Sequence, residues 1–187
     1  MTFWRKLAKA TEGAEIAEMA MVLPVMFLTF LGIFWMGRAY NIYAAANQAA
    51  REGARVAVAP TCATCGSITC GGVPGPYACD TTIENAIKAS LQADHLDLNS
   101  TNVVAPASNL TSTFCGGGSC TTTSNNVMIC RNASLTPAGV APQECGVMIG
   151  FQYKMLSTLP MLNAVPGLQN SLQNMNISAR AQMRAEQ

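Results

Sequence analysis

Charged side chains are scarce in this chain of 187 residues, since Asp, Glu, Lys and Arg make up only 11% of it. An average soluble domain has roughly 25%. The formal net charge is +1. A nucleic-acid-binding protein needs a basic face, so this balance argues against nucleic acid as a partner. It argues equally against an acidic disordered chain, which needs a large charge of one sign.

Signatures of catalysis and of cofactor binding are also missing. The sequence has no H-E-x-x-H, no phosphate-binding loop and no G-x-G-x-x-G. Its single histidine, His95, stands in the segment D-H-L-D at residues 94–97. A Cys–His or Ser–His–Asp site is conceivable there, but a lone histidine after a surface helix is more often solvated. We therefore expect no enzyme activity, no metal and no cofactor.

Cysteine is absent from the first 61 residues, whereas eight cysteines follow: Cys62, Cys65, Cys70, Cys79, Cys115, Cys120, Cys130 and Cys145. An even number confined to one part of the chain predicts disulfides formed in an oxidising compartment. Their pairing stays open, although we expect residues 115–120 to form a tight, disulfide-tied loop. The alternatives use Cys62-x-x-Cys65 as a redox pair or as half of a zinc site. A zinc ribbon needs a second close pair, and four residues separate Cys115 from Cys120.

The longest uncharged apolar run, residues 19–36, predicts a single membrane-spanning helix. At 1.5 Å per residue it spans about 27 Å, close to the thickness of the hydrocarbon core. Arg5, Lys6 and Lys9 precede it and only Arg38 follows closely, so the positive-inside rule places the N-terminus in the cytoplasm. The cysteines then lie outside. A cleaved signal peptide is the alternative, with a possible site at residues 44–46.

Two residues inside or beside this run are unusual for a membrane helix. Glu18 stands at its N-terminal edge. A carboxylate at the bilayer centre costs about 2.5–3.5 kcal/mol, and less near an interface, so such residues usually have a function and a partner. Pro24 removes a helix hydrogen bond, which is tolerated in membranes where neighbours compensate.

Residues 38–59 continue at helical spacing, giving one helix of about 45 residues and roughly 70 Å. Ala45, Ala49 and Gly53 form a row of small residues that permits close helix approach. This row packs either on the chain's own domain or beside other helices, and the length favours the second. Arg51, Glu52 and Arg55 form either a solvated face or a partner contact.

The remaining residues predict a small α+β domain with an antiparallel sheet. A capping box at residues 81–84 begins a helix over 82–94. Strands are expected at 101–105, 127–130, 146–154 and 174–184. In the last two, the alternation points residues 147, 149, 151 and 153, and residues 175, 177, 179, 181 and 183, inward. Disulfides would offset a thin core.

The N-terminal quarter resembles a known family. A basic leader ends at Gly13 and Glu18 stands five residues later, which resembles the prepilin-peptidase site of type IV pilins and pseudopilins. The segments AEMAMVLPVMFL at 17–28, GR at 37–38 and AAREGARVA at 49–57 resemble TadE-like minor pilins of tight-adherence (Tad/Flp, type IVb) systems, as does the end of the chain at 181–186. Met19 departs from major Flp pilins, which carry tyrosine there.

This resemblance implies a leader peptide at 1–13, a transmembrane and stalk helix at 14–59, and an external cysteine-rich domain at 60–187. It implies cleavage between Gly13 and Ala14 by a prepilin peptidase in the bacterial inner membrane. The partners would be other Tad pilins and the secretion machinery, and Glu18, Pro24 and the stalk residues would serve assembly. The implied function is non-enzymatic help in building adhesive fimbriae. The alternatives are a membrane-anchored extracytoplasmic thiol oxidoreductase or metal-binding domain, and a type II secretion pseudopilin.

The cleavage site gives the first prediction. N-terminal sequencing of the membrane-extracted protein is expected to begin at Ala14, because the basic leader, Gly13 and Glu18 have the spacing of a prepilin-peptidase site. A chain that begins at Met1 or near Ala46 would contradict the pilin interpretation.

Overall fold

The computed structural model describes residues 11–59, 68–70, 73–75, 78–99, 101–106, 110, 113–137, 140, 142–154 and 176–184. The chain divides into two compact units, residues 1–41 and residues 42–187. The division falls within the N-terminal helix, whereas the sequence placed a domain boundary at 59/60. The last turns of that helix therefore belong to the packing of the second unit.

A single α-helix, α2 (Thr11–Val58), accounts for all the described residues of the first unit and begins the second. Pro24 lies inside it without ending it. The predicted long helix is confirmed. Its residues 19–36 carry no charged side chain, whereas small residues dominate one face of its C-terminal part.

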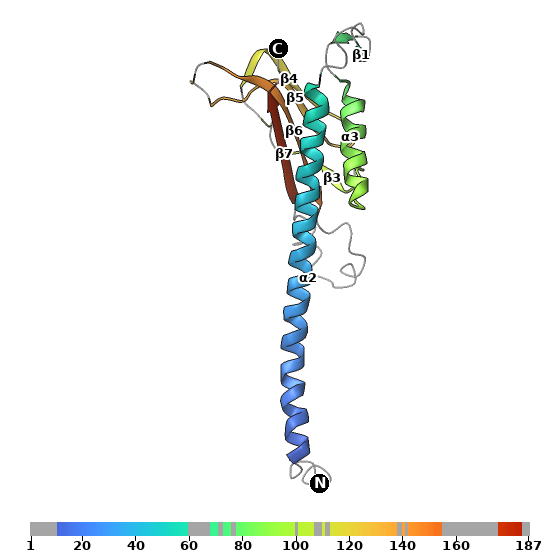
Figure 1. Cartoon of the computed structure of the whole chain (residues 1–187), viewed down its shortest axis with the longest axis vertical. Helices are drawn as coiled ribbons and strands as arrows, with labels where there is room; N and C mark the ends of the chain where they lie inside the picture. Colours follow the sequence, from blue (N-terminus) through green and yellow to red (C-terminus); the bar gives the residue numbers. More distant parts are fainter. Residues whose placement is uncertain are drawn as a thin grey trace. The chain divides into compact units, whose positions relative to one another are not determined.

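In its described residues the second unit adds helix α3 and strands β1 to β7 to the end of α2 (Figure 1). In chain order these elements are β1 (Ile68–Cys70), β2 (Val73–Gly75), α3 (Asp80–Ala93), β3 (Val103–Val104), β4 (Phe114–Thr122), β5 (Met128–Ser134), β6 (Cys145–Lys154) and β7 (Asn176–Arg184). Strands β1 and β2 pair with each other, and the other five form one sheet. All the pairings are antiparallel, which confirms the predicted α+β class.

Strand β6 is the centre of the five-stranded sheet. It pairs with β7 over nine consecutive residues, from Gly146 to Lys154. The first half of β6 also pairs with β5, and its end pairs with the short β3. Since a strand has two edges, β5 and β3 share one edge of β6 and β7 takes the other. Strand β4 pairs with β5 and forms the far side of the sheet.

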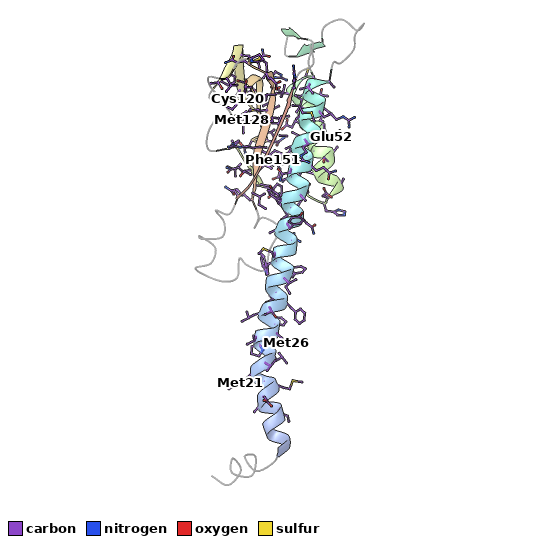
Figure 2. All side chains as sticks on the ribbon, turned by 60° about the vertical axis from the view of Figure 1, so that its left-hand side comes forward. Met21, Met26, Glu52, Cys120, Met128 and Phe151 are labelled. Atoms are coloured by element: carbon purple, nitrogen blue, oxygen red, sulfur yellow. A yellow bond between two sulfur atoms is a disulfide. The ribbon has the colours of Figure 1, made fainter. Side chains whose placement is uncertain are left out.

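The main core lies between one face of this sheet and the helices. Figure 1 shows α3 beside the last turns of α2. The sheet contributes alternate residues of β6, and α3 contributes one face: Val147, Ile149, Phe151 and Tyr153, then Ile83, Ile87 and Leu91. Phe151, which is labelled in Figure 2, is completely buried. The predicted inward alternation of β6 is confirmed, as is that of the described part of β7, where Ala179 is buried.

The buried residues of α2 in this core are small apart from one isoleucine: Ile42, Ala45, Ala46, Ala49, Ala50, Gly53, Ala54 and Ala57. Val56 and Val58 also pack against the core and are partly buried. The contact is closest at Gly53. A Cβ atom there would lie 2.6 Å from Cγ1 of Ile87 and 3.3 Å from Cδ1 of Ile149. Ala45, Ala49 and Gly53 are buried within the second unit, which supports the first of the two predicted packings, on the chain's own domain. Their packing beside other helices stays a prediction.

A smaller apolar cluster covers the opposite face of the sheet. Met128, Cys130 and Ala133 are buried there, and Leu110, Phe114, Cys120 and Met148 pack against them. Leu110 lies directly over Gly150, where an added Cβ would come within 2.5 Å of Cδ2 of Leu110. Both faces of the sheet are thus covered over β5 and part of β6.

Two local expectations are wrong. Helix α3 begins at Asp80, and its N-cap residue, Cys79, makes no side-chain capping bond, so the capping box is not formed. Glu84 instead accepts hydrogen bonds from Thr123 and from Asn125, at 3.1 and 2.6 Å. Glu84 thus bonds to residues of the β4–β5 turn and does not cap its own helix.

The second correction concerns residues 115–120, which form part of strand β4 rather than a tight loop. Its pairing with β5 shifts register between Phe114 and Ser119. Gly116 and Gly117 adopt positive φ, at 39° and 84°, which glycine tolerates without strain. The glycines therefore form a bulge inside a strand. Strand β5 is longer than predicted and β3 is shorter.

The Gly53 contact gives a stability prediction. Gly53→Ala is expected to lower the stability of the external domain, although alanine favours a helix by about 1 kcal/mol, because its Cβ enters the space of Ile87. Gly53→Val should cost more, in the range of about 1–3 kcal/mol typical of overpacking. Denaturant unfolding of the detergent-solubilised protein measures both.

The matched control is Gly37→Ala in the same helix. No other group lies within 4 Å of a Cβ at Gly37, so this variant should not be destabilised. Equal effects at both positions would show that the close approach at Gly53 does not limit stability.

Candidate functional site

The described part of the first unit is an uncovered apolar helix. One helix among the described residues is long and apolar enough to cross a membrane, and none of its most apolar stretch is buried. Figure 2 shows Met21 and Met26 projecting from it. Large exposed apolar side chains occur throughout the span: Ile16, Met19, Met21, Val22, Leu23, Val25, Met26, Phe27, Leu28, Phe30, Leu31, Ile33, Phe34 and Met36. Such a surface needs lipid or other helices to cover it.

Glu18 is the one described acidic residue within this apolar helix surface. Its side chain is exposed, and within the described residues it has no hydrogen bond or ion pair. Gly13 and Ala14 lie in the helical backbone of α2. Ala14 precedes Glu18 by four residues, so the two positions are neighbours on successive turns. Pro24 follows Glu18 by six residues on the same helix.

The charged stalk residues point away from the core of the second unit. Arg51, Glu52 and Arg55 are all exposed, whereas Gly53 between them is buried. Glu52 and Arg55 form no ion pair in the described part of the chain. The helix therefore presents one charged, unoccupied face, and of the four predicted stalk contacts only Gly53 is already used inside the chain.

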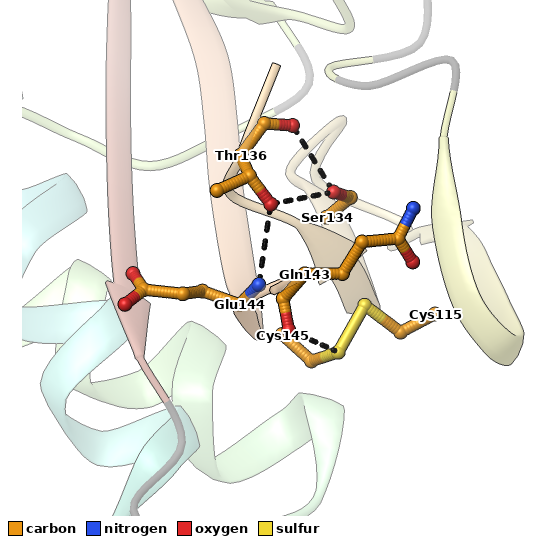
Figure 3. The surroundings of a disulfide bond; sticks show 6 residues. All are labelled: Cys115, Ser134, Thr136, Gln143, Glu144 and Cys145. Carbon is orange, nitrogen blue, oxygen red and sulfur yellow. Dashed lines mark hydrogen bonds between the residues drawn. A yellow bond between two sulfur atoms is a disulfide. The ribbon is translucent and has the colours of Figure 1, made fainter. Parts of the chain in front are cut away.

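One disulfide joins strands that are not neighbours. Cys115 on β4 and Cys145 on β6 are bonded, with their Cα atoms 6.0 Å apart (Figure 3). Strand β5 lies between β4 and β6 in the sheet. The bulge at Gly116 and Gly117 supplies the extra chain that lets Cys115 reach past β5.

The second disulfide joins direct partners. Cys120 and Cys130 face each other in the β4–β5 register and are bonded. Cys79 is also disulfide-bonded. Sulfur atoms already in disulfides are not available as thiolate ligands, so Cys115 and Cys120 do not form half of a zinc site. The residues Cys62 and Cys65, and the side chain of Cys70, lie outside what the structure describes.

An ion pair that the sequence did not predict holds the start of α3 on the sheet. Arg131 Nη1 lies 2.6 Å from Asp80 Oδ1, and Arg131 Nη2 donates a hydrogen bond to the carbonyl of Ala78 at 2.8 Å. Thr121 donates to the other carboxylate oxygen of Asp80 at 3.1 Å. These groups flank Cys79. Because the residues are far apart in the chain and individually ordinary, no local pattern marks them.

The second unit is thus a disulfide-bonded α+β domain, and it follows an apolar helix of membrane-spanning length. The described residues therefore define the class of protein: a folded domain that follows, in the sequence, a membrane-type helix. Residues 13–55 match the family model of TadE-like proteins, which confirms the resemblance of this segment. The matched range contains Gly13, Glu18, Pro24 and the stalk residues. Comparisons with curated proteins and with solved structures found no match.

The disulfides give a prediction of pairing. We expect all eight cysteines of the exported protein to be oxidised, so its unreduced mass should lie eight hydrogens below the reduced mass. Peptide mapping without reductant should recover the 115–145 and 120–130 linkages. A 115–120 linkage, or two or more thiols that alkylate without reductant, would contradict this arrangement.

The two described bridges should differ in their contribution to stability. Their sequence separations are 30 and 10 residues. In the chain-entropy account the longer loop is worth about 3–4 kcal/mol and the shorter about 2–3 kcal/mol. Replacing both members of each pair by alanine and measuring denaturant unfolding should place the larger loss at 115–145. The reverse order would mean that the burial of Cys130 outweighs loop entropy.

Proposed function

We propose that this protein is a minor pilin or pseudopilin that assists assembly of Tad/Flp-type adhesive fimbriae and catalyses no reaction. The observation that carries the proposal is the match of residues 13–55 to TadE-like proteins. It is supported by the uncovered apolar helix in the same range, which suits lateral packing in a membrane. The partners we propose are other Tad pilins or pseudopilins and the Tad secretion machinery.

The proposed location is the bacterial inner membrane, with the N-terminus in the cytoplasm. Arg5, Lys6 and Lys9 before the apolar run support this orientation. It places the disulfide-bonded domain on the periplasmic or extracellular side, where disulfides form and persist. A prepilin peptidase would cleave between Gly13 and Ala14 and leave a free amine on Ala14.

In this proposal the carboxylate of Glu18 forms an ion pair that aligns neighbouring subunits during assembly. Neither the new ammonium on Ala14 nor the Glu18 carboxylate can remain ionised cheaply in hydrocarbon without a partner. Paired between adjacent subunits, each group compensates the other and fixes the axial register of the two helices. The exposed, unpaired state of Glu18 in the described chain is consistent with such a role. The same two groups could also pair within one helix, since they are four residues apart.

The stalk face is the second proposed assembly contact. Arg51, Glu52 and Arg55 leave their charges exposed on the side of α2 that the domain does not cover. Charged groups in such positions favour correct partners and register more than they add affinity. We therefore assign this face to contacts with neighbouring pilins.

A thiol oxidoreductase or metal-binding domain is the less favoured function. A reactive cysteine needs an accessible thiolate. Cys115, Cys120, Cys130 and Cys145 are instead bonded to one another, and Cys130 is completely buried. In the described domain these bridges connect strands and have a structural role.

The proposed mechanism predicts that Glu18→Ala permits export, cleavage and folding but reduces fimbria yield severely. Glu18→Asp should be milder, because the charge survives with a shorter reach. Surface fimbria yield is compared with immunoblots of the cleaved, membrane-bound protein. Met21→Ala is the matched control, since Met21 is another exposed side chain of the same span and carries no charge.

Normal cleavage of Glu18→Ala together with wild-type fimbriae would contradict the intersubunit role. Failure of cleavage itself would place Glu18 in peptidase recognition instead. If the Met21→Ala control loses fimbriae to the same extent, the defect belongs to the apolar surface rather than to the carboxylate.

A further inference from the structure

Strand β7 is an edge of the five-stranded sheet. It pairs with β6 through nine uninterrupted register positions and, among the residues that the structure describes, with no other strand. No bulge interrupts it and its sequence, NISARAQMR, contains no proline. Bulges and prolines are features that often protect edge strands against pairing with another strand. The backbone of β7 therefore offers a long, regular edge to an additional strand.

Along this edge, the core-facing side chains of β7 are less buried than their partners on β6. On β6 the inward residues Tyr153, Ile149 and Val147 are only 1%, 0% and 4% exposed. Their register partners on β7 are Ile177, Ala181 and Met183, and all three are only partly buried. An added strand would cover this row if it placed apolar side chains on the same face.

The other face of β7 carries a cation, Arg180, beside a pocket with apolar and polar walls. The pocket has a volume of about 260 Å³ and is lined by Leu110, Met148, Ile149, Arg180, Ala181 and Gln182. It is open and smaller than the roughly 300–1,000 Å³ of typical small-molecule sites. An extended peptide lying along β7 fits it better, because only part of such a ligand needs to enter.

The two arginines on this face of β7 differ in whether they form an ion pair. Arg184 pairs with Glu144, with Nη1 to Oε1 at 3.2 Å. Arg180 lies at the middle of β7, is exposed, and has no ion pair in the described chain. A guanidinium beside an apolar floor favours a carboxylate in the bound segment.

We propose that the edge of β7 that pairs with no described strand binds an extended segment of a partner protein in which apolar and acidic side chains alternate. The partner's backbone extends the sheet, its apolar side chains cover Ile177, Ala181 and Met183, and an acidic side chain meets Arg180. This mode of recognition combines main-chain hydrogen bonds with specificity from alternate side chains. It adds a binding surface to the assembly role above and does not depend on Glu18.

Charge complementarity selects this occupant over two others. A second copy of β7 paired about its centre would set Arg180 opposite Arg180, and like charges directly opposite are destabilising. The chain's own connection between β6 and β7, residues 155–175, contains no Asp or Glu and cannot supply the carboxylate. The arginine thus disfavours self-pairing while it selects an acidic strand.

The test measures binding of synthetic peptides to the full-length protein in detergent micelles. The probe is a fluorescent, end-blocked peptide of nine residues with alternating Val and Glu, and its counterpart has Lys in place of Glu. We expect saturable binding of the acidic peptide and at least tenfold weaker binding of the basic one. Arg180→Glu should reverse this preference. Lys88→Glu, on the exposed face of α3, is the matched control and should leave it unchanged.

A second pair of probes separates strand addition from simple charge attraction. The acidic peptide is N-methylated on alternate residues, once on the Val positions and once on the Glu positions. Because a strand pairs through one edge, one of these peptides should lose binding and the other should keep it. The proposal is overturned if the acidic peptide fails to bind at 1 mM, if Arg180→Glu does not change the preference, or if both methylated peptides bind as the parent does.

Discussion

The close approach between α2 and the rest of the second unit determines how this domain is built. Alanine and glycine on one face of the helix leave no side-chain volume between its backbone and Ile87 and Ile149. Larger residues would move the helix outward and open the core to water, since protein interiors tolerate neither voids nor overlap. Nearer its N-terminus the same helix is long and apolar enough to cross a membrane. One element thus contributes both this apolar span and part of the domain core, so substitutions on its small face act on the fold of the domain.

Polar contacts and disulfides stabilise the parts of the domain that the main core does not reach. The Arg131–Asp80 pair holds the first turn of α3 on the sheet, and Glu84 binds the β4–β5 turn. On the opposite face the Cys120–Cys130 bridge lies within the smaller apolar cluster. These features explain how a domain with few large apolar residues maintains two covered sheet faces.

Sequence patterns predicted the regular elements and missed those that depend on distant partners. The long helix follows from an uninterrupted apolar run and the helical spacing after it, and β6 follows from the alternation at 147–153. The capping box failed because Glu84 found partners about forty residues away, on the β4–β5 turn. Strand β4 was missed because three successive glycines predict a loop, whereas pairing with β5 and two disulfides hold them in a strand. The Gly13–Glu18 spacing and the matched segment at 13–55 were visible directly, because that signal is local. The edge of β7 and its pocket could not be predicted from the sequence, because they exist only once the sheet has formed.

The Cys115–Cys145 bridge also has a mechanical consequence. A pulling force on a folded domain extends the polypeptide by unravelling it between the points where the force enters and leaves. The bridge closes a loop across a sequence separation of 30 residues that includes all of β5. While it is intact, a pull applied outside this loop cannot lengthen the chain within it, which removes about 100 Å of contour length from any forced extension. Because the disulfide transmits the force past the loop, β5 cannot be pulled out of the sheet as an extended chain. The force then acts on the segments outside the loop, with α2 among them.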